Sequence, residues 1–224
     1  MSNLSSSTLF HFTSSLDVIE QILEGGIKYG MFAEKFPKGK MAYFIRGISF
    51  CNIPLSMISE HVDWYGKYAI GIKRPKLREM GVSPVFYIHS GTKMFPSSKN
   101  VSTLIDNLFL CYLKQYLGYQ FHKTERKYLK KSFIDEKEWR IFAGTPSIEK
   151  YKSLEELEEL RKQKDGKTPS VEPLKVSLDM IEYIILESAV DFGAFDDFLK
   201  SRFPKERERF LPKVLFYSQI KKDF

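Results

Sequence analysis

The stretch FIDEKEWRIFAG, Phe133 to Gly144, decides how the rest of the sequence is interpreted, because it places four charged residues directly before an apolar run. Side chains alternate between the two faces of a strand. One face of this segment therefore carries Glu136, Glu138 and Arg140, and the other carries Trp139 and Ile141. The pattern predicts a strand over 138–143 with one face in the core and a charged face on an open cleft. An edge strand whose carboxylates face water explains the same pattern.

Length and composition predict one folded domain. The chain has 224 residues, of which 43% are hydrophobic and 15% aromatic, and this is enough for a large packed core. We expect a single domain over 1–224 with a surface helical insertion at about 150–173, where Ser153 and Glu156 form a capping box. The longest apolar run, 101–121, contains Asp106 and Lys114, so it is expected to be a buried helix rather than a membrane span.

The N-terminus lacks the basic start and apolar core of a secretion signal, so a cytoplasmic location without membrane association is expected. Cys51 and Cys111 have neither CxxC spacing nor a local histidine pair, which predicts two small buried side chains and no metal. The net charge of +7 favours encounter with anions. Lysines and arginines are dense at 123–131 and 200–210, among aromatic residues, and a nucleic-acid surface or a solvated face explains either run.

Periodicity and turn residues indicate the secondary structure. Strands are expected at 8–13, 41–53 with a break at Gly47, 68–74, 83–91, 138–143, 183–186 and 213–220. Helices are expected at 14–26, 53–67, 101–121, 153–164 and 192–203. Strands and helices mix without βαβ alternation or a glycine-rich phosphate loop, which favours an α+β fold over a doubly wound nucleotide fold.

Three places in the sequence could carry chemistry. His11 lies on the first strand, on the same face as Thr13. Tyr65 ends a helix one turn after His61, and Glu138 opens the charged strand. Each residue has an ordinary structural explanation when taken alone. A strand histidine, a helix-end tyrosine and a late strand glutamate occur together in this order, and this combination favours a functional site.

These residues carry a resemblance to known families. The segment RGISFCN…SEHVDWYGKYAIGIK resembles the nicotinamide-binding segment of poly(ADP-ribose) polymerases. His11 in LFHFT, Tyr65 in DWYG and Glu138 in EKEWR fall where the His–Tyr–Glu triad of ADP-ribosyltransferases would fall. The HFTS start, ISFCNIPLS with HxxxYG, and EKEWRIF together resemble the AbiGi-type family of bacterial abortive-infection proteins, over roughly residues 8–190. The resemblance implies a split antiparallel or mixed β-sheet flanked by helices.

The resemblance also implies an activity, which is transfer of ADP-ribose from NAD to a protein or nucleic-acid acceptor without a metal. Glu138 would be catalytic, stabilising the cationic ribose carbon as nicotinamide leaves. His11 would bind a ribose hydroxyl and Tyr65 would stack on nicotinamide. The remaining residues expected to bind the cofactor are Thr13, Phe50, Arg140 and, more weakly, Arg46, with Arg140 keeping Glu138 ionised or contacting pyrophosphate.

The sequence departs from the ADP-ribosyltransferase pattern at two points, and two other functions are consistent with it. Ser49 stands where the polymerases carry a stacking tyrosine, so Phe50 or Tyr43 would have to replace that ring, and Glu136 shares the predicted face of Glu138. The chain could instead be a catalytically silent antitoxin or regulatory partner of a toxin protein, or an RNA-binding module that uses its basic segments. For the enzyme, Glu138→Gln is expected to remove NAD turnover and to leave folding intact.

Overall fold

The computed structural model describes residues 6–36, 40–91, 107–122 and 125–223. Within these ranges the strands are β1 Thr8–Thr13, β2 Gly30–Lys35, β3 Met41–Cys51, β4 Tyr68–Lys73, β5 Ser83–Pro84, β6 Phe86–Ile88, β7 Leu113–Gln115, β8 Leu117–His122, β9 Lys127–Ser132, β10 Glu138–Lys150, β11 Ile181–Leu186 and β12 Val214–Phe216. The α-helices are α1 Leu16–Gly25, α2 Ser59–Tyr65, α3 Arg74–Glu79, α5 Asn107–Leu110, α6 Leu154–Lys167, α7 Phe192–Arg202, α8 Arg207–Phe210 and α9 Tyr217–Asp223. Short 3-10 turns lie at Leu55–Met57, Ile134–Glu136, Ala189–Asp191 and Leu211–Lys213.

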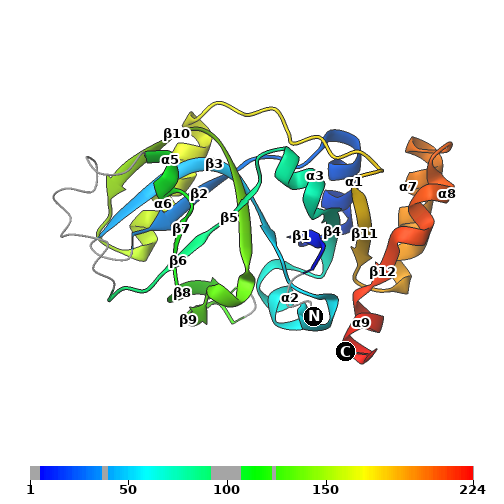
Figure 1. Ribbon diagram of the computed structural model, residues 1–224, viewed down its shortest axis with the longest axis horizontal. Coiled ribbons are helices and arrows are strands. Elements are labelled where there is room, and N and C mark those ends of the chain that lie inside the picture. Colours follow the sequence, from blue (N-terminus) through cyan, green and yellow to red (C-terminus); the bar gives the residue numbers. More distant parts are fainter. Residues whose placement is uncertain (1–5, 37–39, 92–106, 123–124, 224) are drawn as a thin grey trace.

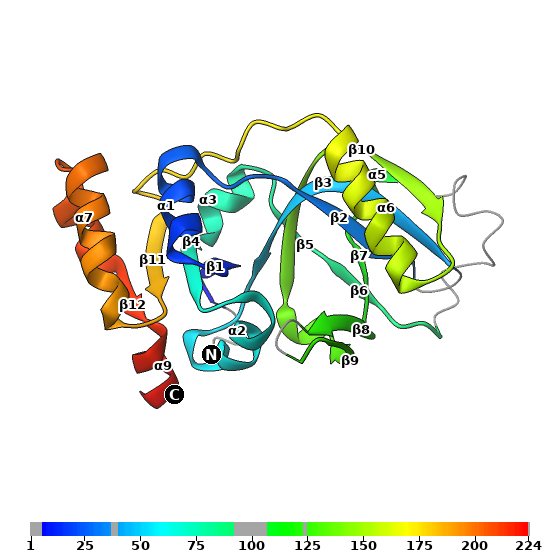
Figure 2. The ribbon, with the colours of Figure 1, turned by 180° about the vertical axis from the view of Figure 1, so that it is seen from behind.

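One mixed, largely antiparallel sheet organises the α+β fold. Its strand order in the described residues is β12-β11-β4-β1-β3-β10-β5, with β2 also paired to β3. Helices α1 and α7 pack on one face through Ile19, Ile22, Phe195 and Leu199. On the other face α2 and α9 contribute Val62 and Ile220 to a second apolar cluster. Figure 1 shows α7, α8, β12 and α9 together at one end, and Figure 2 shows α6 lying over β2 at the other.

The sheet splits between β1 and β3. Strand β1 pairs with β4 along its whole length, from Thr8 to Thr13, but meets β3 only at the pair Phe10 and Cys51. The edge of β3 that faces β1 pairs with β2 over its first half, from Gly47 to Ala42. Between these two partners, near Ser49, the backbone of β3 has no strand beside it on that edge, and a buried carbonyl there needs another donor.

The sequence predicted many of these elements correctly. Strands at 8–13 and 68–73 and helices α1 and α7 are confirmed, as is α6, whose N-cap Ser153 accepts a hydrogen bond from the Glu156 amide. Cys51 and Cys111 are both buried, as expected. None of the helices in the described part of the chain is long and apolar enough to cross a membrane.

The expected long helix at 101–121 is wrong over most of the part that the structure describes, because only α5, Asn107–Leu110, is helical. Residues 101–106 lie outside the described residues, and 107–121 form the short helix α5 followed by β7 and most of β8. The segment is rich in tyrosine and phenylalanine, which suit strands, and Gly118 weakens a helix there. A short apolar run fits the periodicity of a helix and that of a strand equally well. Here the pairing of β7 with β6 favours the strand.

Several boundaries also differ. Strand β3 runs unbroken through Gly47, where an added Cβ would lie 2.6 Å from the Phe142 ring, so this glycine makes room for packing. The helix expected at 53–67 is a 3-10 turn followed by α2, the strand at 83–91 divides into β5 and β6, and 213–220 gives a short strand followed by α9. Strands β2, β8 and β9 were not predicted. Strand β10 extends to Lys150, and Glu136 precedes it in a 3-10 turn.

Gly66 fixes the end of α2 against the end of β1. Its φ is +123°, and an added Cβ would lie 2.2 Å from the Thr13 carbonyl oxygen. We expect Gly66→Ala to lower the free energy of unfolding by at least about 2 kcal/mol, because both backbone strain and a clash oppose it. Urea titration measures the effect. Gly30→Ala is the control, since nothing lies within 4 Å of its added Cβ, and equal stability of the two variants would contradict the prediction.

Candidate functional site

His11 closes the split in the sheet. Its Nδ1 lies 2.9 Å from the Ser49 carbonyl oxygen, the backbone group that no strand satisfies on that edge. A carbonyl only accepts, so Nδ1 carries the proton and Nε2 is left as an acceptor. Burial lowers the pKa of His11, although the hydrogen bond to Ser49 opposes this shift. The imidazole is therefore neutral near pH 7 and presents one acceptor nitrogen beside the split.

Tyr65 reaches the same region from the last residue of α2. Its hydroxyl donates to a carboxylate oxygen of Glu136 in a short hydrogen bond. Its ring lies 4.5 Å from the His61 ring, and the Lys131 ammonium lies 4.3 Å from its centroid. Burial first, and then the neighbouring Glu136 charge, raise the pKa of Tyr65 well above its usual value. The phenol is therefore a permanent hydrogen-bond donor whose ring already contacts a cation.

Glu138 is buried, and cations hold its carboxylate. Arg140 binds it in a bidentate pair, with Nε 2.7 Å from Oε1 and Nη2 2.8 Å from Oε2, and the Lys114 ammonium lies 2.5 Å from Oε2. The side chain is 6% exposed and that of Arg140 is 0% exposed. The alternative of an edge strand with solvated carboxylates is wrong, because β10 lies between β3 and β5 and its charged face is internal.

Glu136 faces the same cluster for a different reason than the one predicted. Lys137 adopts a left-handed conformation with a φ of +43°, so the two glutamates do not share a face through strand alternation. The 3-10 turn directs Glu136 inward, where Lys114 and Lys131 each lie 2.6 Å from one of its oxygens. Lys114 thus joins both carboxylates.

Charge pairing determines the ionisation of this cluster. Burial raises the pKa of both carboxyls, but Arg140 and Lys114 lower that of Glu138, and Lys114 and Lys131 lower that of Glu136; the cations prevail in both cases. Burial lowers the pKa of Lys114, yet the two glutamates raise it well above its usual value. All of these groups are charged at neutral pH.

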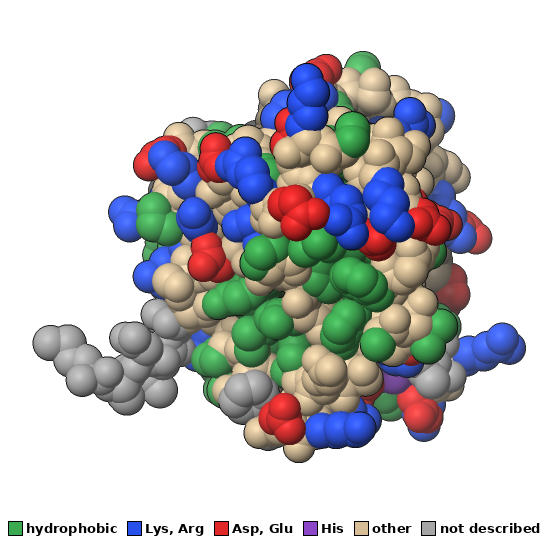
Figure 3. All heavy atoms as spheres, turned by 90° about the vertical axis from the view of Figure 1, so that its right-hand side faces the viewer, with side chains coloured by type: hydrophobic (Ala, Val, Ile, Leu, Met, Phe, Trp, Pro, Cys, Tyr) green, Lys and Arg blue, Asp and Glu red, His purple; other side chains and the backbone are tan. Residues whose placement is uncertain are grey.

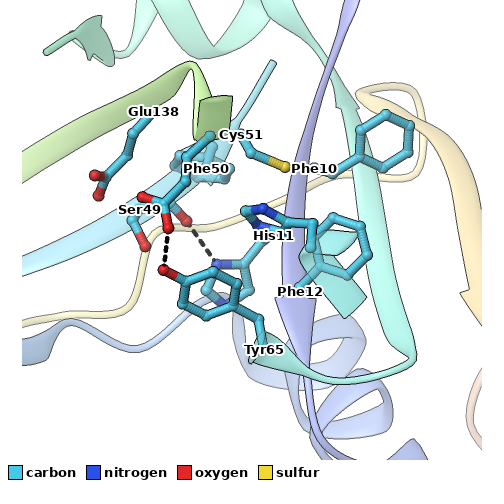
Figure 4. A pocket seen from close by; sticks show the side chains of 10 residues that line it. Phe10, His11, Phe12, Ser49, Phe50, Cys51, Tyr65 and Glu138 are labelled. Carbon is cyan, nitrogen blue, oxygen red and sulfur yellow. Dashed lines mark hydrogen bonds between the residues drawn. The ribbon is translucent and has the colours of Figure 1, made fainter. Parts of the chain in front are cut away.

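The His11, Tyr65 and Glu138 side chains line one small cavity of about 50 Å³ at the split (Figure 4). They come from β1, α2 and β10, and Ser49 and Phe50 of β3 complete the wall between them. A second cavity of about 260 Å³ shares Ser49, Tyr65 and Glu138 and extends along β2 toward β8. The structure therefore brings together three side chains that the sequence placed far apart, with a hollow between them.

Of the other predicted site residues, Phe50 lines the small cavity, whereas Arg140 and Thr13 do not. Phe50 lines the small cavity, with its ring centroid 5.8 Å from that of His11. Arg140 lies behind Glu138 and also binds Glu34. Thr13 ends β1 opposite Tyr68 and is not among the residues lining the cavity.

Arg46 lies in another part of the fold. It contacts the Asp165 carboxylate and donates to the Asp165 and Thr168 carbonyls at the end of α6, beside a separate cavity. The structure does not bring it near Glu138. In the described residues, no group of three or more side chains is suited to hold a metal ion.

Sequence reasoning missed Lys114 and Lys131 as members of the site. The sequence predicts a helix around Lys114, and a charge such as Lys114 in an apolar run is the signal of a buried ion pair. Lys131 was seen only as part of a basic surface segment. In the fold, β7 and β9 bring the two lysines to the carboxylates.

His61 makes stability depend on pH. Burial, the largest effect, lowers its pKa to about 4, although the charge of Glu136 opposes this and Lys131 and Lys114 add to it. The unfolded chain therefore binds more protons between pH 6.5 and 4, and the free energy of unfolding falls as the pH drops through that window, by up to about 3 kcal/mol. His61→Phe should remove most of this dependence, since its neighbours Phe12 and Tyr65 are aromatic. Urea titrations at pH 7 and pH 5 test it; identical pH slopes in both proteins would contradict the assignment.

Comparison with known proteins identifies a family for this chain. Searches of curated proteins and of solved structures give no match. A family model described as "Putative abortive phage resistance protein AbiGi, antitoxin" matches residues 44–187, which include most of β3 and all of α2, β4 and β10. The match covers more than half of the chain and contains Tyr65 and Glu138, while His11 and the end formed by α7 to α9 lie outside it. This chain therefore belongs to the AbiGi family of putative abortive phage resistance proteins, which is described as an antitoxin family.

Proposed function

We propose that the protein acts in phage defence as an ADP-ribosyltransferase-like enzyme that transfers ADP-ribose from NAD to a macromolecule. The observation that carries this proposal is the meeting of His11, Tyr65 and Glu138 at one hollow in a split sheet. The same three residue types, in the same chain order, prompted the resemblance to ADP-ribosyltransferases. Membership of an abortive-infection family agrees with a role in defence.

In the proposed reaction, the bond between the ribose C1′ and the nicotinamide nitrogen breaks, and nicotinamide leaves with the bonding electrons as a neutral molecule. The cationic C1′ is then attacked by an oxygen or nitrogen of the acceptor, which loses its proton to a base. An ionised carboxylate beside C1′ stabilises the positive charge as it develops. Glu138 is that carboxylate, and the cations around it keep it ionised.

His11 and Tyr65 would position the dinucleotide. The free Nε2 of His11 accepts from a ribose hydroxyl, which requires the neutral imidazole that burial favours. On Tyr65 the Lys131 ammonium lies over the ring where the resemblance implies a cationic pyridinium. An aromatic face attracts the ammonium and the pyridinium alike, because each is a cation. Nicotinamide would therefore replace Lys131 on the Tyr65 ring.

The size of the site sets a requirement on this proposal. Both cavities at Glu138, about 50 and 260 Å³, are smaller than the roughly 300 Å³ at the low end of ligand sites. Binding of a dinucleotide therefore needs the hairpin of β8 and β9, which carries Lys131, to shift away from Tyr65. Such a shift would replace the contact of the Lys131 ammonium with the Tyr65 ring by a contact of the nicotinamide pyridinium with the same ring.

Incubation with NAD labelled in the nicotinamide ring and, separately, in the adenine tests the activity. Release of labelled nicotinamide together with adenine label on protein or nucleic acid supports transfer, and release with free ADP-ribose supports hydrolysis only. Mass spectrometry of cellular macromolecules after expression then searches for the mass gain of one ADP-ribose. An absence of nicotinamide release under all conditions, with folded protein and cell extract present, rejects the enzymatic proposal.

A second candidate is a catalytically silent antitoxin or regulatory partner of a toxin. Three observations favour it. Both oxygens of Glu138 are already held by Arg140 and Lys114, and the family model is described as an antitoxin. In addition, hydrophobic side chains gather on the face formed by the C-terminal elements α7 to α9 and β12 (Figure 3), as at protein interfaces. Co-purification of a neighbouring gene's product that is unaffected by substitutions at His11, Tyr65 and Glu138 supports this candidate.

A further inference from the structure

The hairpin of β8 and β9 exposes an aromatic and basic face. Residues directly opposite each other in an antiparallel pair lie on the same side, and here Leu117 pairs with Ser132, Tyr119 with Lys130, and Phe121 with Tyr128. Tyr119 is 57% exposed, Phe121 47%, Leu117 40% and Tyr128 38%. We call this side, formed by Leu117, Tyr119, Phe121, Tyr128 and Lys130, the hairpin platform.

The other side of the hairpin faces the site. Gln120 lies 3.3 Å from the Tyr65 hydroxyl, the His122 ring is 4.5 Å from the Trp64 ring, and Lys131 contacts both Tyr65 and Glu136. These contacts account for the inward residues and leave the outward aromatic row without a structural explanation. Exposed aromatic rings cost free energy in water, and a contiguous group of them marks a binding surface.

Charge at the platform points to an anionic occupant. In the described residues Lys130, which pairs with Tyr119, forms no ion pair with a carboxylate. Lys35 approaches from β2, with its ammonium 3.2 Å from the Tyr119 carbonyl. The acidic start of α6, with Glu155 and Glu158, bounds the platform on the side of Tyr128.

The second basic segment behaves differently. In α7 and α8, Lys200, Arg207 and Arg209 each contact an aspartate. Its charge is therefore largely neutralised on the surface, so the structure separates two segments that the sequence treated alike.

We propose that the hairpin platform binds single-stranded nucleic acid. Bases stack on exposed rings such as Tyr119 and Phe121 while lysines beside them meet the phosphates, and such binding tolerates any sequence because each base has a flat face. Tyr119 also lines the larger cavity at Glu138, and Lys130 lines a neighbouring one with Trp64 and Lys131. If the proposed ADP-ribosyl transfer holds, a strand on the platform would place its bases at the mouth of the site, and the acceptor would be single-stranded nucleic acid.

Binding is tested without NAD, so that the result does not depend on the proposed reaction. Fluorescence anisotropy of the full chain with labelled 12-nucleotide deoxythymidine and uridine oligomers, and with a 12-base-pair duplex, is measured from 50 to 200 mM salt. We expect single strands to bind and the duplex to bind more weakly. The two oligomers distinguish DNA from RNA as the source of the strand.

Substitutions then locate the binding surface. Tyr119→Ala and Phe121→Ala should each weaken binding about tenfold, and Lys130→Ala should lower the dependence of log K on log salt by about 0.7. Phe86→Ala, an aromatic residue 56% exposed on β6, and Lys205→Ala, an exposed lysine in the second basic segment, are the matched controls and should bind as the wild type does. Thermal melts verify that each variant is folded.

Each outcome decides the proposal. Absence of single-strand binding at 50 mM salt overturns it, as does binding that platform variants leave unchanged or that control variants weaken equally. If a toxin protein co-purifies and Tyr119→Ala releases it while oligomers do not bind, the platform is a protein interface instead. Platform-dependent oligomer binding without any nicotinamide release keeps this inference and rejects the proposed reaction, whereas ADP-ribosylation of protein alone keeps the reaction and rejects nucleic acid as its acceptor.

Discussion

Replacement of Glu138 by glutamine is expected to lower the rate of NAD turnover by about two orders of magnitude or more. The amide keeps the size of the side chain and loses the negative charge that would face the ribose C1′. Nicotinamide release under saturating NAD measures the effect. Because cations lower the pKa of Glu138, turnover should not decline at mildly acidic pH through protonation of this group.

The same substitution also has a structural effect that the sequence did not predict. An amide beside Arg140 and Lys114 leaves these buried cations with one negative charge fewer, so Glu138→Gln is expected to destabilise the fold. Folding was expected to be intact only because the charged face was taken to be open. Activity must therefore be compared at a temperature at which each variant is fully folded, as verified by circular dichroism.

Glu34→Gln is the matched control for this experiment. Glu34 also binds Arg140, at 2.7 Å, and it lines the second cavity with Tyr65 and Glu138, but it does not line the small cavity with His11. We expect Glu34→Gln to share part of the stability loss and to keep most of the turnover. Equal turnover in wild type and Glu138→Gln would remove Glu138 from the reaction, and equal losses in both variants would assign the effect to the ion pairs rather than to catalysis.

His11, Tyr65 and Glu138 could be named from the sequence because each lies in a strand or helix that its neighbouring residues predict. Strand β1 is a short run rich in leucine and phenylalanine, α2 ends at a glycine after Tyr65, and the change from charged to apolar residues marks β10. Their meeting at one hollow was implied by the resemblance alone, because no local pattern encodes which strands pair. Strand β2, which takes the place of β1 beside β3 and so creates the split, was missed altogether.

The ionic cluster could not be predicted, because it depends on contacts between distant segments. Lys114 reaches Glu136 and Glu138 only because the segment predicted as a helix folds as β7, and helix periodicity would direct its side chain elsewhere. The choice between the two glutamates was left open for the same reason. In the structure both line the cavity, but Glu138 is held by Arg140 of its own strand and Glu136 by the Tyr65 hydroxyl.

Arg140 is expected to be the side chain on which the stability of this region depends most. It is completely buried, binds Glu138 and Glu34, and donates to the Tyr43 hydroxyl and the Cys111 carbonyl, at 2.9 and 3.2 Å. Removal of one partner of a buried ion pair leaves an uncompensated charge, which typically costs about 3–5 kcal/mol. Arg140→Met keeps an unbranched chain and removes the guanidinium charge, and we expect it to lower the free energy of unfolding by about that amount.

Urea denaturation with linear extrapolation measures this loss, and an unchanged slope of free energy against urea concentration shows a change in stability without a change in the surface exposed on unfolding. Arg46→Met, the same change on β3, is the control; its partner Asp165 is 46% exposed, so its ion pair should contribute only about 1 kcal/mol or less. In the double variant of Arg140→Met with Glu138→Gln, both charges of one pair are gone, and the total loss should be smaller than the sum of the single losses by more than about 1 kcal/mol. A loss in Arg140→Met no larger than in Arg46→Met, or strict additivity in the double variant, would show that the buried charges act independently and that Glu138 does not need Arg140 to remain ionised at the split.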